Sequence, residues 1–195
     1  MMIRNTFIIS LLLLLASATN GYSSNTAIIC LGASLTEGEG ADKGHDYPTD
    51  LSKMLNMPVI NAGVNGDTTE DELDRMQGDV LQNNPRMVII TQRANDLKLG
   101  IPKQETLNNL ESMIDQIQAR GAIAVLVTFE PKELQETYFK DVREMSIRKH
   151  AVLVADVLQG VDTNPQYMHD KIHPNNEGYL LVAQRVYKII KPYLD

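Results

Sequence analysis

Short runs of apolar residues recur along the chain from about residue 26, and amphipathic segments separate them. The apolar runs lie at 26–32, 57–63, 86–92, 122–129 and 151–157. Each run is short and shows little polar alternation, which is typical of a strand that is buried on both faces. The pattern therefore predicts five strands that belong to one parallel sheet.

The segments between these runs have the apolar spacing of helices. The clearest covers 102–121, where a proline opens the segment, a glycine closes it, and one face carries Leu107, Leu110, Ile114 and Ile117. Further helices are expected at 47–56, 68–82, about 133–148 and about 176–190. Strands that alternate with helices predict an α/β fold, a flavodoxin-like three-layer sandwich with a five-stranded parallel sheet. In such sheets ligands bind at the carboxyl ends of the strands.

The first residues follow a different pattern. Arg4 precedes an apolar run at 7–15, and the small residues Ala16-Ser17-Ala18 follow it. This arrangement predicts a signal peptide over about 1–18, followed by a single domain over 26–195. The apolar run is shorter than the roughly 20 residues that span a bilayer, so we expect cleavage and no stable membrane span. The protein is therefore predicted to be exported, either to the periplasm or out of the cell.

Composition narrows the class of partner. A chain of 195 residues is long enough for one domain with a core of its own. Its formal net charge of −7 argues against nucleic acid or an anionic membrane as a partner. The single cysteine, Cys30, lies inside an apolar run and is interpreted as a core residue. We expect a monomer that acts on a small-molecule or lipid substrate.

Polar residues with possible chemistry follow the predicted strands. Ser34 comes directly after the first strand, within Gly32-Ala33-Ser34, and Asp170 and His173 precede the last helix. A serine hydroxyl needs a base within hydrogen-bond reach before it can act as a nucleophile, and a carboxylate can orient a histidine base. Asp170 and His173 are three residues apart, so a tight 3₁₀-like turn would place one above the other. Taken alone, Ser34 is also a common turn or N-cap residue.

An acyl-transfer site also needs donors for the developing oxyanion. The candidates are the backbone N–H groups of Ser34 and Gly63 and the side-chain amide of Asn95, which follow the first three strands. Gly63 is a candidate because no side chain blocks approach to its amide. His45, His150 and His169 show no metal-ligand spacing with one another or with the cysteine, and no cofactor or metal is expected.

Four motifs in this order resemble those of the SGNH hydrolases, also called GDSL-type esterases and lipases. The motifs are "GASL", "NAGVNGDT", "RAND" and "DKIHP", and the resemblance covers about residues 26–193. It is nearest to the small bacterial acyl thioesterases, arylesterases and lysophospholipases. It implies Ser34 as nucleophile, Gly63 and Asn95 as oxyanion donors, and Asp170 with His173 as the remaining catalytic pair. It also implies a serine hydrolase that cleaves esters or thioesters through an acyl-enzyme, and the predicted signal peptide makes this an exported enzyme.

Two positions depart from the family pattern. Ala33 stands where the first motif usually has Asp, and Arg93 stands where the third usually begins with Gly. Both are candidate substrate-binding positions together with Leu97, and Arg93 is suited to an anionic substrate group. Met57, Leu97, Leu99 and Ile101 would line an acyl groove if the substrate is a lipid, and the alternative for these four residues is a place in the core. The alternatives left open are a carbohydrate O-acetylesterase and a weakened binding protein that keeps the pocket without turnover.

Overall fold

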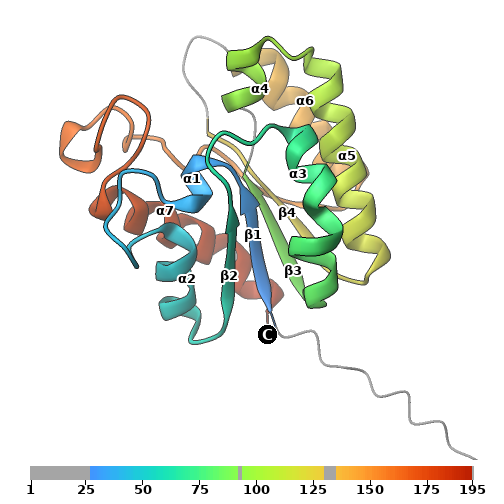
Figure 1. Ribbon diagram of the computed structural model, residues 1–195, viewed down its shortest axis with the longest axis horizontal. Helices are drawn as coiled ribbons and strands as arrows, with labels where there is room; N and C mark the ends of the chain where they lie inside the picture. The colour runs from blue at the N-terminus through green and yellow to red at the C-terminus, as the bar shows by residue number, and fades with distance from the viewer. Residues whose placement is uncertain (1–26, 92–93, 130–134, 195) are drawn as a thin grey trace, which may run out of the picture.

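The protein folds around one parallel sheet, as the apolar runs predict. The computed structural model describes residues 27–91, 94–129 and 135–194. The strands are β1 Ile28–Gly32, β2 Val59–Gly63, β3 Met87–Thr91, β4 Ile123–Val127 and β5 Val152–Val154. They lie in the order β2-β1-β3-β4-β5 and every neighbouring pair is parallel (Figure 1). This order is that of a flavodoxin-like doubly wound sheet.

Helices cover both faces of the sheet (Figure 1). The α-helices are α1 Ser34–Glu37, α2 Tyr47–Leu55, α3 Thr69–Arg75, α4 Ala94–Leu99, α5 Lys103–Ala119, α6 Gln135–Arg148 and α7 Asn176–Ile190. Residues of α2 and α7 pack on one face of the sheet, and residues of α3, α5 and α6 pack on the other. The predicted α/β three-layer sandwich is therefore confirmed.

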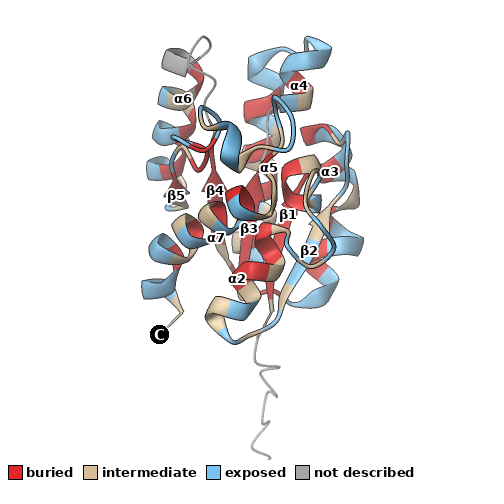
Figure 2. Cartoon of the chain, turned by 90° about the vertical axis from the view of Figure 1, so that its left-hand side faces the viewer, coloured by how far each residue is buried: buried red, intermediate tan, exposed pale blue. Residues whose placement is uncertain are grey.

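Strand β1, which lies between β2 and β3, shows how the apolar runs build two cores. All five residues of β1 are buried. Ile28 and Cys30 point to the layer of α2 and α7, while Ile29 and Leu31 point to the layer of α3, α5 and α6. Successive strand residues face opposite sides of a sheet, so a run without polar residues supplies both layers at once. Figure 2 shows the buried inner strands enclosed by helices whose outer faces are exposed, while the edge strand β2 is exposed or half-buried.

Two segments differ from the sequence prediction. The helix expected at 68–82 divides into α3, a π-helical turn at Met76–Val80 and a 3₁₀ turn at Leu81–Asn83. Gly78 lies in the π-helical turn, where its low helix propensity favours a break in the α-helical pattern. The predicted helices do not include α4, a short helix that follows β3 in the sequence.

The amino-terminal segment lies outside the described residues, so the signal peptide over 1–18 stays a prediction. Within the described ranges, no helix combines the length and the apolar character needed to cross a bilayer.

Candidate active site

Ser34 is held at the carboxyl end of β1, an interior strand of the sheet. It is the first residue of α1, and Ala33 caps this helix without a side-chain hydrogen bond. The strand can turn so sharply because Gly32 has no side chain: an added Cβ would overlap the Thr36 hydroxyl and lie 2.8 Å from the Thr91 carbonyl oxygen. The sequence "GAS" therefore provides a tight turn that leaves Ser34 partly exposed.

The structure brings the distant residues Asp170 and His173 to Ser34. His173 Nε2 lies 3.1 Å from Ser34 Oγ, and His173 Nδ1 lies 2.9 Å from Asp170 Oδ2. The predicted juxtaposition of these three residues is present, although the turn type differs. The loop is an irregular bend closed by an antiparallel bridge between Met168 and Pro174.

The second carboxylate oxygen of Asp170 shapes this loop. Asp170 Oδ1 accepts hydrogen bonds from the backbone N–H groups of Ile172 and His173, both at 2.7 Å. The hydrogen bond from the His173 ring, followed by these two backbone bonds, holds the pKa of Asp170 well below its usual range. Asp170 therefore stays ionised and favours the tautomer in which His173 carries its proton on Nδ1. Nε2 is then free to accept the proton of the Ser34 hydroxyl.

The loop after β2 corrects one sequence prediction. The Gly63 N–H, expected as an oxyanion donor, instead donates to Asn61 Oδ1 at 2.9 Å. Gly63 is required for a different reason, because an added Cβ would overlap the backbone nitrogen of Glu37. Gly63 thus permits close packing of β2 against α1, and its amide is already engaged.

Gly66 is the residue that the sequence prediction passed over. Among the described residues, the Gly66 N–H is the one amide of 63–68 without a hydrogen-bond acceptor. Gly66 has a φ of 92°, and the space where a Cβ would stand is open. Its sequence signal was a glycine in a polar turn after a strand. The other amides donate as follows: Gly63 to Asn61 Oδ1, Val64 to Gly32 O, Asn65 to Glu37 Oε2, Asp67 to Val64 O and Thr68 to Asp71 Oδ2.

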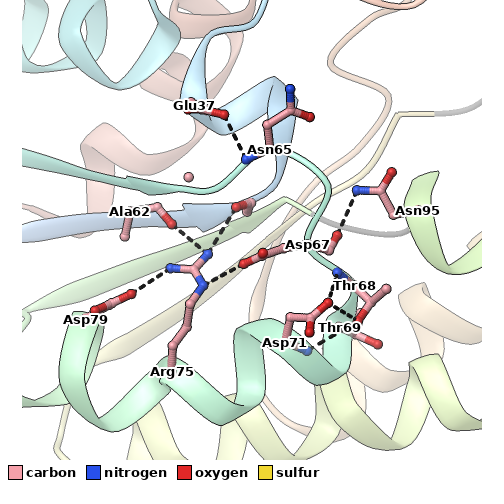
Figure 3. A network of polar contacts seen from close by, with 12 residues as sticks. Glu37, Ala62, Asn65, Asp67, Thr68, Thr69, Asp71, Arg75, Asp79 and Asn95 are labelled. Carbon is pink, nitrogen blue, oxygen red and sulfur yellow. Dashed lines mark hydrogen bonds and ion pairs between the residues drawn. The ribbon is translucent and has the colours of Figure 1, made fainter.

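Asn95 joins the same loop from the next strand. It lies on α4, and its Nδ2 donates to the Asp67 carbonyl oxygen at 2.8 Å (Figure 3). The neighbouring Asp96 is buried, and its carboxylate accepts hydrogen bonds from the Thr69 amide at 3.0 Å and the Thr106 hydroxyl at 3.0 Å. Asp96 thereby anchors α4 to α3 and α5 and fixes the position of Asn95.

The remaining candidate positions differ in their outcome. Arg93 lies outside the described residues, and Ala33 is buried beside Ser34. Leu97 is 41% exposed on α4, at the carboxyl end of the sheet. For Met57 the structure supports the core alternative, since this residue precedes β2 at the opposite end of the sheet and packs against the core.

A thiol nucleophile and a metal site find no support in the described part of the chain. Burial raises the pKa of the Cys30 thiol to about 12, so the reactive thiolate does not form near neutral pH. Within the same ranges, no group of three or more His, Cys, Asp or Glu side chains is arranged to hold a metal ion.

A family comparison agrees with this geometry. The model of the GDSL-like lipase/acylhydrolase family matches residues 30–181, which include Ser34 and His173. The chain belongs to this family. It is therefore an ester-hydrolysing enzyme, and the resemblance found in its four motifs is confirmed.

Relatives with curated names extend the comparison. The chain is 28% identical over 170 residues to an arylesterase of Vibrio mimicus, covering 82% of this chain and 85% of that one. It is 24% identical over 176 residues to thioesterase 1/protease 1/lysophospholipase L1 of Escherichia coli (strain K12), covering 86% and 85%. The crystal structure of TesA superimposes with a TM-score of 0.78 at 25% identity, covering 86% of this chain and 99% of that one.

Proposed function

We propose that this enzyme is a serine hydrolase that cleaves carboxylic esters or thioesters, with Ser34 as nucleophile, His173 as general base and Asp170 as the group that orients the base. The proposal is carried by one observation, the hydrogen-bonded series from Ser34 Oγ to His173 at 3.1 Å and from His173 to Asp170 at 2.9 Å. This is the arrangement that activates a serine hydroxyl for acyl transfer.

In the proposed reaction, His173 Nε2 takes the proton of the Ser34 hydroxyl while Oγ attacks the acyl carbonyl carbon. His173 then gives this proton to the leaving oxygen or sulfur, and the bond from that atom to the acyl carbon breaks. Water, activated by the same imidazole, releases the acid from the acyl-enzyme. Ala33 replaces the usual Asp of the family motif, yet the Ser34–His173 hydrogen bond still forms. This favours an active enzyme over the alternative of a binding protein without turnover.

For the oxyanion we propose three donors, the N–H groups of Ser34 and Gly66 and the side-chain amide of Asn95. The three residues follow β1, β2 and β3, whose ends are in register at Gly32, Gly63 and Thr91. Gly66 replaces Gly63 in this set because its amide has no other acceptor among the described residues. Loss of one such donor typically costs about 10²–10³-fold in rate.

Exposed apolar side chains support an aryl or acyl group as the part of the substrate next to this site. Val64, Leu97 and Ile172 are 43%, 41% and 65% exposed, and they lie on the segments that carry Gly66, Asn95 and His173. The names of the arylesterase and thioesterase relatives point in the same direction. A carbohydrate O-acetylesterase is the alternative, and it would hydrolyse acetyl esters faster than long-chain esters. The signal-like segment at 1–18 further supports export to the periplasm or beyond.

The test is hydrolysis of p-nitrophenyl esters from acetate to decanoate by the mature protein, by Ser34→Ala and by Ser112→Ala. Ser112 lies on α5, away from the carboxyl ends of the strands, and serves as the matched control. We expect Ser34→Ala to abolish hydrolysis and Ser112→Ala to leave it unchanged. Hydrolysis by Ser34→Ala at the wild-type rate would overturn the proposal. A strict preference for acetate would select the acetylesterase alternative.

A further inference from the structure

Arg75 occupies an unusual position beneath the loop that carries Gly66. Its guanidinium donates from Nε to Asp67 Oδ2 at 2.6 Å and from Nη1 to Asp79 Oδ2 at 3.0 Å. Its Nη2 donates to the Ala62 carbonyl at 2.9 Å and to the Gly32 carbonyl at 3.2 Å (Figure 3). One side chain from α3 thus holds the carboxyl ends of β1 and β2 and the loop between β2 and α3.

This contact is shielded from water. The Arg75 and Asp67 side chains are only 18% and 13% exposed. A charged pair with so little solvent keeps most of its attraction, and its loss leaves polar groups without partners. The planar guanidinium is the side chain that can reach several acceptors in one plane, whereas a lysine ammonium is a single point charge.

Asp67 connects Arg75 to two of the proposed oxyanion donors, Gly66 and Asn95. Its backbone follows Gly66 directly, and its N–H closes the turn by donating to the Val64 carbonyl at 3.2 Å. Its carbonyl oxygen receives the Asn95 side-chain amide at 2.8 Å. A displacement of Asp67 therefore moves the Gly66 amide and releases the Asn95 amide together.

Ser34 is tied to the same loop from its other side. Glu37 lies on α1, the helix that Ser34 begins, and its Oε2 accepts the Asn65 N–H at 2.7 Å. The loop is thus bound to the nucleophile helix through Asn65 and to the strand ends through Arg75. These attachments set the distance between the proposed nucleophile and the proposed donors.

We propose that Arg75 is a positioning residue for the reaction: through Asp67 it fixes the Gly66 and Asn95 donors relative to Ser34. The inference rests on the proposed function. Arg75 does not touch the substrate, so its loss should leave substrate affinity largely intact and weaken transition-state stabilisation. Misplacement of reacting groups by about 1 Å costs about 10²-fold in rate, and we expect a loss of kcat of that order in Arg75→Met.

The experiment compares Arg75→Met, Arg75→Lys and Asp67→Asn with wild type on a matched pair of substrates, a p-nitrophenyl ester and the corresponding thionoester. Sulfur accepts hydrogen bonds more weakly than oxygen, so the thionoester benefits less from an oxyanion hole. The control is Arg86→Met, because Arg86 donates to the Leu194 carbonyl at 2.9 Å at the opposite end of the sheet. Thermal unfolding is recorded for every variant.

We expect Arg75→Met to lower kcat with little change in KM and to lower the ester-to-thionoester ratio of kcat/KM. Arg75→Lys should recover only part of kcat, and Asp67→Asn should reproduce both effects if Arg75→Met is too unstable to assay. Arg86→Met should leave the ratio unchanged. An unchanged ratio in Arg75→Met and in Asp67→Asn, whatever happens to Tm, would overturn the proposal and leave Arg75 a purely structural residue.

The failure of this inference can be told apart from failure of the proposed function. If Ser34→Ala retains hydrolysis, the proposed chemistry itself is wrong. If Ser34→Ala is inactive and the Arg75 and Asp67 variants keep the wild-type ratio, only the positioning role is wrong.

Discussion

Replacement of Asp170 by Asn separates the two tasks that the carboxylate performs. Asp170 Oδ1 accepts two backbone hydrogen bonds at 2.7 Å, while Oδ2 accepts one from His173 Nδ1 at 2.9 Å. An asparagine keeps one oxygen and gains an NH₂ group in place of the other. The backbone N–H groups of Ile172 and His173 are two donors, whereas the His173 ring is one. The asparagine therefore turns its side-chain oxygen toward the two backbone N–H groups.

The NH₂ group then faces His173 Nδ1, and two donors cannot share that contact. The imidazole must present a lone pair at Nδ1 and carry its proton on Nε2, where it can no longer accept the proton of Ser34. Forcing the wrong tautomer in a serine triad costs about 10⁴-fold in kcat, which corresponds to about 5.5 kcal/mol at 1.36 kcal/mol per factor of ten. The loop should remain folded because its two backbone bonds to the side chain survive.

The assay is steady-state hydrolysis of the preferred p-nitrophenyl ester by wild type, Asp170→Asn and Asp170→Ala, with thermal unfolding of each. We expect Asp170→Asn to unfold close to the wild-type Tm while kcat falls by about four decades. The alanine variant loses the loop bonds as well, so it should have the lower Tm of the two. A kcat for Asp170→Asn within tenfold of wild type would refute the assignment of the tautomer to Asp170.

Two further predictions concern pH and the glycines of the site. The His173 ring and the two backbone N–H groups hold the pKa of Asp170 below its usual range, so Asp170 stays ionised down to about pH 4. Above that pH only the general base can take up a proton, so log(kcat/KM) should fall with a slope of one on acidification. A slope of two would contradict a single titrating base. The depressed pKa also means that the Asp170 contribution to stability is present above about pH 4 and is lost as pH falls below it. Gly63→Ala should lower the free energy of unfolding by about 1–3 kcal/mol through overpacking, because its Cβ would overlap the Glu37 backbone. Gly66→Ala meets no atom, and its positive φ of 92° should cost only about 1–2 kcal/mol. Thermal unfolding of the two variants checks both costs, and a wild-type Tm for Gly63→Ala would contradict the overlap with Glu37.

The fold was predictable because strands buried on both faces leave a strong signal. All five apolar runs form strands of the sheet, and the last helix begins and ends where its pattern predicts, at Asn176 and Ile190. Parallel strands bring their carboxyl ends to one edge, so the convergence of Ser34 and Asn95 followed from the order of strands and helices alone.

The choice between Gly63 and Gly66 could not be made from sequence. Both are glycines after the same strand, and they differ in whether the N–H group already has an acceptor. That depends on the Asn61 side chain folding back onto Gly63, a contact between neighbours that no spacing rule reveals. The role of Arg75 was hidden for a related reason, since two of its four acceptors are the backbone carbonyls of Gly32 and Ala62, which leave no residue signature.

The position of Cys30 has a practical consequence. Its thiol lies in the middle of β1, fully buried, with a pKa raised to about 12. Thiol reagents attack the thiolate, so the folded protein behaves toward them as if it had no cysteine. Because this is the one cysteine of the chain, its modification reports when β1 leaves the sheet. The rate of Cys30 modification in the native sequence therefore measures global unfolding. A second cysteine introduced on the surface would be the single reactive site of the folded protein for attachment of a probe.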